Sequence, residues 1–317
     1  MEKKELVRLL ALKDFSPVYK RADAVRREHV GDEVHIRAII EFSNICVRKC
    51  RYCGLNSTNQ GIIRYRMSAD EILDTARQAV SAGYRTIVLQ SGEDPCFHKE
   101  TLGEIVKEIK RMGSAVTLSC GELTPEELAY LRECGADRYL LKHETADPEL
   151  YEQLHPCGTL DERVECLRTI HSLGYETGSG FMIGLPGQSL ETIADDLLLL
   201  KQLHCSMAGI GPFIPHPDTP MGHEKEGSPE LTKRAVALAR LVLPEANLPV
   251  TTSLGVINQK EKENAFACGA NVIMKKVTPD PYKEAYQIYP AKLEKTDIRK
   301  DRNLLEEQIR GLGRIPL

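Results

Sequence analysis

The feature that most constrains the fold of this 317-residue chain is a regular alternation of short apolar runs and longer amphipathic segments. The first run, HIRAIIEF at 35–42, is strand-like. A helical stretch at 68–83 follows, opening with Ser68, carrying Glu71 three residues later and closing on glycine. Further strand-like runs lie at 86–90, 115–119, 138–141, 176–183, 207–214, 250–253 and 271–274, and the intervening helical segments lie at 99–112, 124–134, 160–173, 190–203, 232–243 and 260–268.

Eight strands with a helix between each successive pair predict an α/β fold, a (β/α)8 barrel of the TIM type. A doubly wound open sheet would show a similar alternation and is the alternative. The barrel is favoured because the residues suited to chemistry follow the strands, on the C-terminal face where barrel enzymes place their active sites.

The domain organisation follows from the absence of any linker rich in Ser, Gly or Pro within this series. The sequence predicts one catalytic barrel at residues 35–290. Residues 1–34 are expected to form an N-terminal helical extension, and the charged segment 291–317 a C-terminal helical tail packed on the barrel.

Charge and hydropathy exclude two classes of partner. Lys and Arg number 42 against 46 Asp and Glu, a net charge of −4 without long blocks of one sign, which removes the electrostatic case for nucleic-acid binding. The N-terminus alternates charges with leucines, and no stretch approaches the length of an uninterrupted apolar membrane span. A cytoplasmic protein with no membrane partner is expected.

Three of the ten cysteines form a local constellation. Cys46, Cys50 and Cys53 have the spacing C-x3-C-x2-C directly after a strand. Thiolates are soft ligands, and one compact loop can hold three corners of a [4Fe–4S] cluster. The fourth iron, without a nearby protein ligand, would be free to bind S-adenosylmethionine (SAM) and pass it an electron. A structural zinc site is a weaker alternative because no second ligand pair follows.

The triad, with Tyr52 before its third cysteine, resembles the radical SAM superfamily. The resemblance implies that SAM is cleaved reductively to methionine and a 5′-deoxyadenosyl radical, with an external one-electron donor. It also implies SAM-binding roles for residues that appear in superfamily order. These are Tyr52 against the adenine, the strand-end segment Ser91, Gly92 and Glu93, Glu144 of a His-Glu-Thr segment, Arg163 for the carboxylate, and Met182.

Longer segments are similar to a narrower family, the HydE maturases of [FeFe]-hydrogenase. They include TIVLQSGEDP, GADRYLLKHETADPELY and GYETGSGFMIGLPGQ, and the likeness runs from about residue 35 to 290. It implies action on a small organometallic substrate, a cysteine-bound iron carbonyl cyanide complex, with a HydG-type tyrosine lyase and a HydF-type scaffold GTPase as partners. A radical SAM mutase or lyase such as methylornithine synthase is the alternative enzyme. An iron–sulfur electron carrier or scaffold is the alternative from another class.

Strand-end polar residues fit a small anionic ligand inside the barrel. The candidates are Thr117, Lys142, His143, Thr251, Thr252 and Tyr289, with Ser119 and Ser253 as further hydroxyl donors. Lys142 and His143 would add positive charge. Strand alternation should place only one of Thr251 and Thr252 inside. No cysteine follows Cys268, so the sequence predicts a single cluster; Cys96 and Cys120 are not assigned as ligands.

Overall fold

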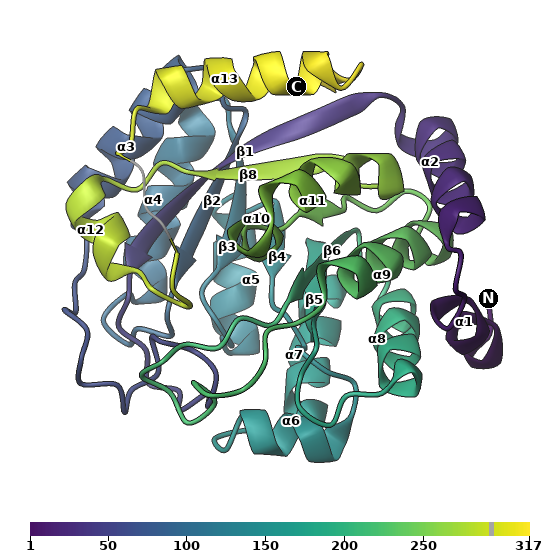
Figure 1. The fold of residues 1–317 in the computed structure, drawn as a ribbon. Coiled ribbons are helices and arrows are strands. Elements are labelled where there is room, and N and C mark those ends of the chain that lie inside the picture. The colour runs from purple at the N-terminus through teal and green to yellow at the C-terminus, as the bar shows by residue number, and fades with distance from the viewer. Residues whose placement is uncertain (292–294) are drawn as a thin grey trace.

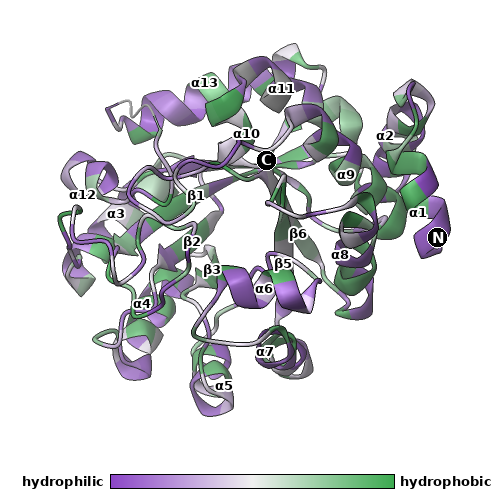
Figure 2. Ribbon diagram, turned by 60° about the horizontal axis from the view of Figure 1, so that its bottom comes forward, coloured by the Kyte–Doolittle hydropathy of each residue, from purple (hydrophilic) through white to green (hydrophobic). Residues whose placement is uncertain are grey.

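The computed structural model, which describes residues 1–291 and 295–317, contains an almost closed parallel barrel (Figures 1 and 2). The strands run in the order β6-β5-β4-β3-β2-β1-β8-β7. Their bounds are β1 Glu33–Ser43, β2 Thr86–Ser91, β3 Ala115–Ser119, β4 Arg138–Leu140, β5 Glu176–Ile183, β6 Met207–Pro212, β7 Pro249–Val250 and β8 Val272–Lys276. The predicted barrel is confirmed.

The ring is completed between β6 and β7 by only a few backbone contacts. Asn247, just before β7, donates from its backbone N–H to the carbonyl of Ser206 at 2.8 Å. Its own carbonyl accepts from the backbone N–H of Ala208 at 3.1 Å. Because β7 has two residues, these strands pair only near their N-terminal ends, and the barrel is most open between them at its C-terminal end.

Helices surround the ring on its outside, as the view along the barrel shows (Figure 2). They are α3 Ala69–Ser81, α4 Lys99–Arg111, α5 Pro125–Glu133, α7 Leu160–Ser172, α8 Leu190–Gln202, α9 Pro229–Val242 and α11 Gln259–Asn264, the last followed by a 3-10 turn at Ala265–Cys268. The predicted cap of α3 is confirmed, because Ser68 and Glu71 bond reciprocally to each other's backbone N–H.

Strand β1 shows how the sequence separates core from cavity. Ile36 and Ile40 are buried in the apolar layer between the strands and the helices. Arg37 and Ile39, on the opposite face of the same strand, line the space inside the barrel. Because successive side chains of a strand point to opposite faces, one face of β1 packs in the apolar layer and the other lines the space inside the barrel.

Shorter elements were not predicted. Helix α6 (Pro148–Leu154) lies near the barrel mouth, α10 (Thr252–Ile257) follows β7, and α12 (Asp280–Ala285) follows β8 (Figure 1). Strand β9 (Ile315–Pro316) pairs with the start of β1.

The chain ends are helical outside the barrel. Helices α1 (Lys3–Leu10) and α2 (Ser16–Val30) precede β1 and pack against α8 and α9, while α13 (Ile298–Gly311) packs against α3. The divisions at 34/35 and 290/291 remain predictions, and residues 292–294 of the expected tail lie outside the described residues. Within the described part of the chain, every helix is too short or too polar to cross a bilayer.

Candidate active site

A cavity of about 350 Å3 opens at the C-terminal ends of the strands. It gathers nearly all of the residues predicted from sequence. Those lining it are Cys46, Cys50, Cys53, Tyr52, Ser91, Gly92, Glu93, Thr117, Lys142, Glu144, Arg163, Met182, Thr251, Thr252 and Tyr289. Ser119, Ser253 and Tyr286 also line it.

The cysteine loop leaves β1 without regular structure and is fixed by contacts on two sides. On one side, the backbone N–H of Glu93 lies 3.4 Å from Cys46 Sγ, and that of Val47 donates to the carbonyl of Glu93 at 3.1 Å. On the other, Arg51 donates from its backbone N–H to the carbonyl of Leu154, at the end of α6, at 2.9 Å. The three thiols are thereby held at the cavity mouth.

A glycine permits the close approach of β2 to this loop. A Cβ at Gly92 would lie 2.3 Å from the carbonyl oxygen of Ile45 and 2.7 Å from Cys46 Cβ. Any side chain there would push the loop away from the strand end. The segment Ser91-Gly92-Glu93 therefore serves the position of the cysteine loop as well as lining the cavity.

The donor set fits an iron–sulfur cluster. All three thiols are free and partly accessible from the cavity. Burial raises the pKa of the Cys53 thiol to about 12 and also raises that of Cys46, so metal binding must displace their protons. Among the described residues, no three His, Cys, Asp or Glu side chains converge to hold a single ion. The spread of the triad is compatible with ligands at separate corners of a cube.

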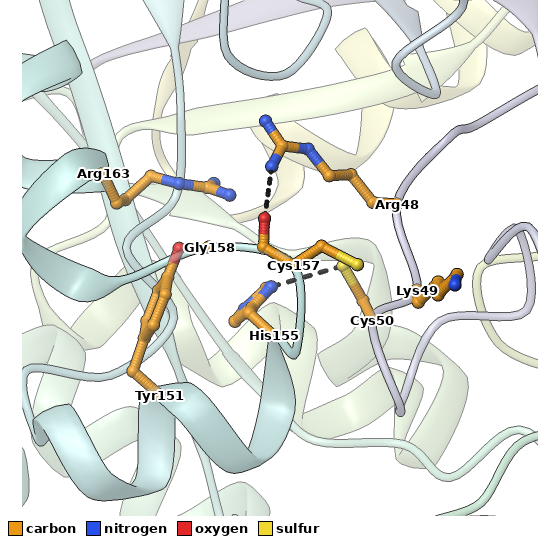
Figure 3. A pocket seen from close by; sticks show the side chains of 8 residues that line it. All are labelled: Arg48, Lys49, Cys50, Tyr151, His155, Cys157, Gly158 and Arg163. Carbon is orange, nitrogen blue, oxygen red and sulfur yellow. Dashed lines mark hydrogen bonds between the residues drawn. The ribbon is translucent and has the colours of Figure 1, made fainter.

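Cys50 also borders a second, small pocket, which shares Arg48, His155 and Arg163 with the cavity (Figure 3). Its Sγ lies 3.2 Å from His155 Nδ1, and the His155 ring stacks on Tyr151 with centroids 4.5 Å apart. Tyr52 meets the same imidazole edge-on at 5.4 Å. The predicted adenine-side tyrosine is therefore oriented by His155, a residue that sequence reasoning missed.

Two arginines and two carboxylates form a network beside the cavity. Arg48 Nε donates to Glu93 Oε2 at 2.5 Å, Nη2 donates to Glu122 Oε2 at 2.7 Å, and Nη1 donates to the carbonyl of Cys157 at 3.0 Å. Glu122 Oε1 in turn accepts from Arg163 Nε at 2.5 Å. The predicted SAM residues Glu93 and Arg163 are thus connected through Glu122 to the loop that carries the cysteines.

Glu144 occupies a left-handed turn with φ of 66°. Its backbone N–H donates to the carbonyl of Gly180 at 3.0 Å, and its carbonyl accepts from Met182 at 3.1 Å. These bonds fix the turn against β5. Its carboxylate pairs with Lys142 Nζ at 2.8 Å, so the charge of Lys142 is directed at Glu144.

His143 is not brought into the cavity. Its side chain is fully buried, with Nδ1 2.9 Å from Ser179 Oγ and Nε2 3.4 Å from Asp196 Oδ1. Burial lowers the pKa of His143 to about 3, so the imidazole is neutral at neutral pH. The expected positive charge is therefore absent. Lys142 and Glu144, on either side of His143 in the sequence, line the cavity, whereas His143 does not.

Thr251 and Thr252 both line the cavity, which corrects the expectation that only one of them would. Strand β7 ends at Val250, Thr251 stands at the N-cap position of helix α10 without a side-chain capping bond, and Thr252 begins the helix. The alternation of a strand therefore no longer applies at these positions. Ser253 Oγ donates to Thr251 Oγ1 at 3.2 Å, which gathers the hydroxyls at one edge.

Sequence reasoning also missed Arg37, which lines the cavity from β1. The residue is 3% exposed, Nε has no hydrogen-bond partner among the described residues, and Nη1 contacts Met207 Sδ at 3.0 Å. Thr117 Oγ1, in the same cavity, likewise lacks a partner among the described residues. Two unsatisfied donors in one cavity suit an anionic or acceptor-rich ligand. The sequence signal that could have revealed Arg37 is its charge within the otherwise largely apolar strand-like run at 35–42.

Barrel, triad and cavity together define a radical SAM enzyme. The Radical SAM superfamily model matches residues 40–200. The chain is 54% identical over 276 residues, 87% of its length and 79% of the relative's, to the [FeFe] hydrogenase maturase subunit HydE of Thermotoga maritima. The chain belongs to the HydE family of the radical SAM superfamily.

Methylornithine synthases are more distant relatives. The chain is 30% identical over 315 residues, 98% of its length and 88% of the relative's, to 3-methylornithine synthase of Methanosarcina acetivorans. A crystal structure of methylornithine synthase superposes with a TM-score of 0.88 at 26% identity, covering all of this chain and 94% of the other. The superfamily implies a [4Fe–4S] cluster and SAM, and the residues present fit both.

Proposed function

We propose that this protein is a radical SAM maturase of [FeFe]-hydrogenase. The observation that carries the proposal is 54% identity to HydE across a chain whose cysteine loop, Glu144 and strand-end hydroxyls line one cavity. The cluster, when bound, supplies the electron for reductive cleavage of SAM. Cys46, Cys50 and Cys53 would hold one cluster, the single cluster of this chain.

SAM would lie between the cysteine loop and the turn at Glu144. The lining groups proposed for it are Tyr52, Ser91, Gly92, Glu93, Glu144, Arg163 and Met182. Tyr52 supplies an aromatic face. Arg163 Nε donates to Glu122 and Nη1 donates to the carbonyl of Lys142 at 2.9 Å, so Nη2 is the nitrogen left to face a carboxylate.

The proposed substrate is a cysteine-bound iron carbonyl cyanide complex. Arg37 and Thr117 offer unsatisfied donors within the barrel, and Thr251, Thr252 and Ser253 place hydroxyls at its edge. Cyanide and carboxylate groups accept hydrogen bonds from such donors. A HydG-type lyase would supply the complex, and a HydF-type scaffold would receive the product.

A methylornithine synthase-like mutase is the second candidate, favoured by the 30% identity over nearly the whole chain. A free amino acid needs an acceptor for its ammonium group. Glu93 and Glu144 are the carboxylates among the described lining residues, and both are paired, with Arg48 and Lys142 respectively. With both carboxylates paired, the unsatisfied donors of Arg37 and Thr117 are the lining groups that favour the anionic complex.

In vitro maturation tests the proposal. Apo-hydrogenase should gain activity when this reconstituted protein is added to HydG, HydF and SAM, and single Ala variants of Cys46, Cys50 or Cys53 should abolish the gain together with cluster iron. Cys96→Ala, at an exposed position outside the cavity lining, is the control. Activation by a triad variant that lacks the cluster would contradict the proposal.

A further inference from the structure

His155 is the first residue after α6, and its backbone is fixed beside the cysteine loop. Its N–H donates to the carbonyl of Tyr151 at 2.8 Å, and its carbonyl accepts from the N–H of Gly158 at 3.2 Å. The carbonyl of the preceding Leu154 accepts from the N–H of Arg51, in the loop, at 2.9 Å. With only 6% of the residue exposed, the imidazole has a defined place at the cavity wall.

The two ring nitrogens of His155 face two residues of the cysteine loop. Nδ1 lies 3.2 Å from Cys50 Sγ, the contact drawn as a dashed line in Figure 3, and Nε2 lies 3.4 Å from the Tyr52 hydroxyl oxygen. All three residues line the main cavity. One imidazole therefore contacts both a proposed cluster ligand and the aromatic ring proposed for the adenine.

The chemistry of Cys50 sets the direction of these hydrogen bonds. A cysteine binds iron as the thiolate, whose sulfur has no proton and can only accept. Nδ1 must then carry the proton and donate to Sγ. The other nitrogen of a neutral imidazole is an acceptor, and the Tyr52 hydroxyl is the donor that reaches it. The two neighbours together assign the tautomer of His155.

Tyr151 holds the imidazole in this orientation. The two rings stack with centroids 4.5 Å apart and an angle of 25° between their planes. The guanidinium carbon of Arg163 lies 6.0 Å from the centroid of Tyr151, and Arg163 is itself held by Glu122. The nitrogens of His155 are therefore directed at the loop by the packing of its ring as well as by its backbone.

Cys50 differs from Cys46 in the source of its hydrogen bond. Cys46 Sγ faces the backbone N–H of Glu93, which a substitution leaves in place, whereas Cys50 Sγ faces a side chain. Hydrogen bonds to the sulfurs of an iron–sulfur cluster are among the features that set its reduction potential. Because reduction adds negative charge, a donor at a ligand sulfur favours the reduced state.

We propose that His155 is a positioning residue that donates from Nδ1 to the Cys50 thiolate and accepts at Nε2 from Tyr52. A single imidazole thereby raises the reduction potential of the cluster and orients the ring that faces the adenine of SAM. This inference rests on the proposed placement of the cluster at Cys46, Cys50 and Cys53 and of SAM beside Tyr52.

A redox titration of the reconstituted protein without SAM, followed by EPR, tests the first role apart from catalysis. His155→Phe keeps a ring that can stack on Tyr151 but removes both nitrogens. At the potential that reduces half of the wild-type cluster, the ratio of reduced to oxidised cluster should fall at least about threefold in this variant. With isotopically labelled histidine, pulsed EPR should show a weak nitrogen coupling to the reduced wild-type cluster that His155→Phe loses.

Two further variants separate the two hydrogen bonds. His155→Asn places an amide nitrogen near the position of Nδ1, so its cluster should titrate close to the wild type. His155→Gln places its amide near the position of Nε2, so its cluster should titrate like that of His155→Phe. The affinity for SAM should follow the opposite order, with His155→Gln close to the wild type and His155→Asn weaker by about threefold or more.

The matched control is His171→Phe, which removes an exposed imidazole on α7 that stacks on His204 away from the cavity lining. It should change neither the potential nor the affinity for SAM. Iron content is measured first, because a wild type that holds no cluster would overturn the maturase proposal as well. Equal potentials in wild-type and cluster-loaded His155→Phe protein would overturn this inference alone. If His155→Phe holds no cluster, identical behaviour of His155→Asn and His155→Gln would overturn it.

Discussion

Arg48 and Glu93 join the cysteine loop to the end of β2 through an ion pair of 2.5 Å between Nε and Oε2. Both side chains are largely buried, and Glu122 shares the same arginine. Substituting Arg48→Ala would leave two partly buried carboxylates without this partner. The free energy of unfolding of the cluster-free protein should fall by about 1–3 kcal/mol, measured by urea denaturation.

The control for that variant is Arg77→Ala, which removes an ion pair to Asp74 whose members are more than half exposed. Exposed pairs contribute little, so the expected change is within about 0.5 kcal/mol. Equal losses in the two variants would show that the Arg48 network does not brace the loop.

Arg37 is expected to lower the stability of the fold and to strengthen ligand binding. It is buried without a carboxylate partner among the described residues, so Arg37→Met should raise the free energy of unfolding by about 1–3 kcal/mol. The same variant should bind the iron carbonyl cyanide complex about tenfold more weakly or worse, because a charged donor is lost. Arg240→Met is the control and should destabilise, since Arg240 donates to Gly269, Pro244 and Asn271. A less stable Arg37→Met protein would contradict this account.

The pH dependence of stability should report the burial of His143. Its pKa falls from 6.5 to about 3 on folding, so the unfolded chain binds the extra proton between these values, and stability is lost as the pH drops below about 6.5. Burial raises the pKa of Asp196, so the contribution of this carboxyl to stability is lost as the pH rises, which is the opposite of the trend set by His143. We therefore compare Asp196→Asn with Asp196→Asn/His143→Gln. The single variant should lose more stability between pH 6.5 and 4 than the double variant; parallel curves would rule out a buried neutral imidazole.

Gly180 should resist substitution because β5 and β6 touch there. A Cβ at Gly180 would lie 2.0 Å from the carbonyl oxygen of Gly209, and Gly180 also holds the turn at Glu144. Gly180→Ala should cost about 1–3 kcal/mol or more in thermal or urea unfolding and weaken SAM binding. Gly311→Ala, with open space around its Cβ, should be neutral or slightly stabilising. An unchanged Gly180→Ala protein would mean that the strands can separate without cost.

Local patterns predicted the framework well. The apolar run Ala115–Ser119 is a strand at those bounds, and Ser68 with Glu71 forms the predicted cap, because both depend on near neighbours in sequence. The radical SAM assignment followed from three cysteines on one loop and is confirmed by the comparisons. Local spacing was sufficient because the three cysteines lie within eight residues of the sequence.

Features that depend on distant contacts were not predictable. The side-chain direction of His143 is set by Ser179 and Asp196, far along the chain. The early end of β7, which brings both Thr251 and Thr252 to the cavity, reflects the short pairing at the barrel seam. The Arg48–Glu122–Arg163 network and the cavity position of Arg37 likewise become visible only when the strands are arranged around the ring.

The central claim is tested most directly by mass spectrometry of the nucleosides formed when anaerobically reconstituted, reduced protein is incubated with SAM. Parallel samples contain no substrate, the cysteine-bound iron carbonyl cyanide complex, or lysine. The account predicts an adenosyl–sulfur adduct only with the iron complex. Stimulation of 5′-deoxyadenosine by lysine instead, or the absence of any SAM cleavage, would contradict it.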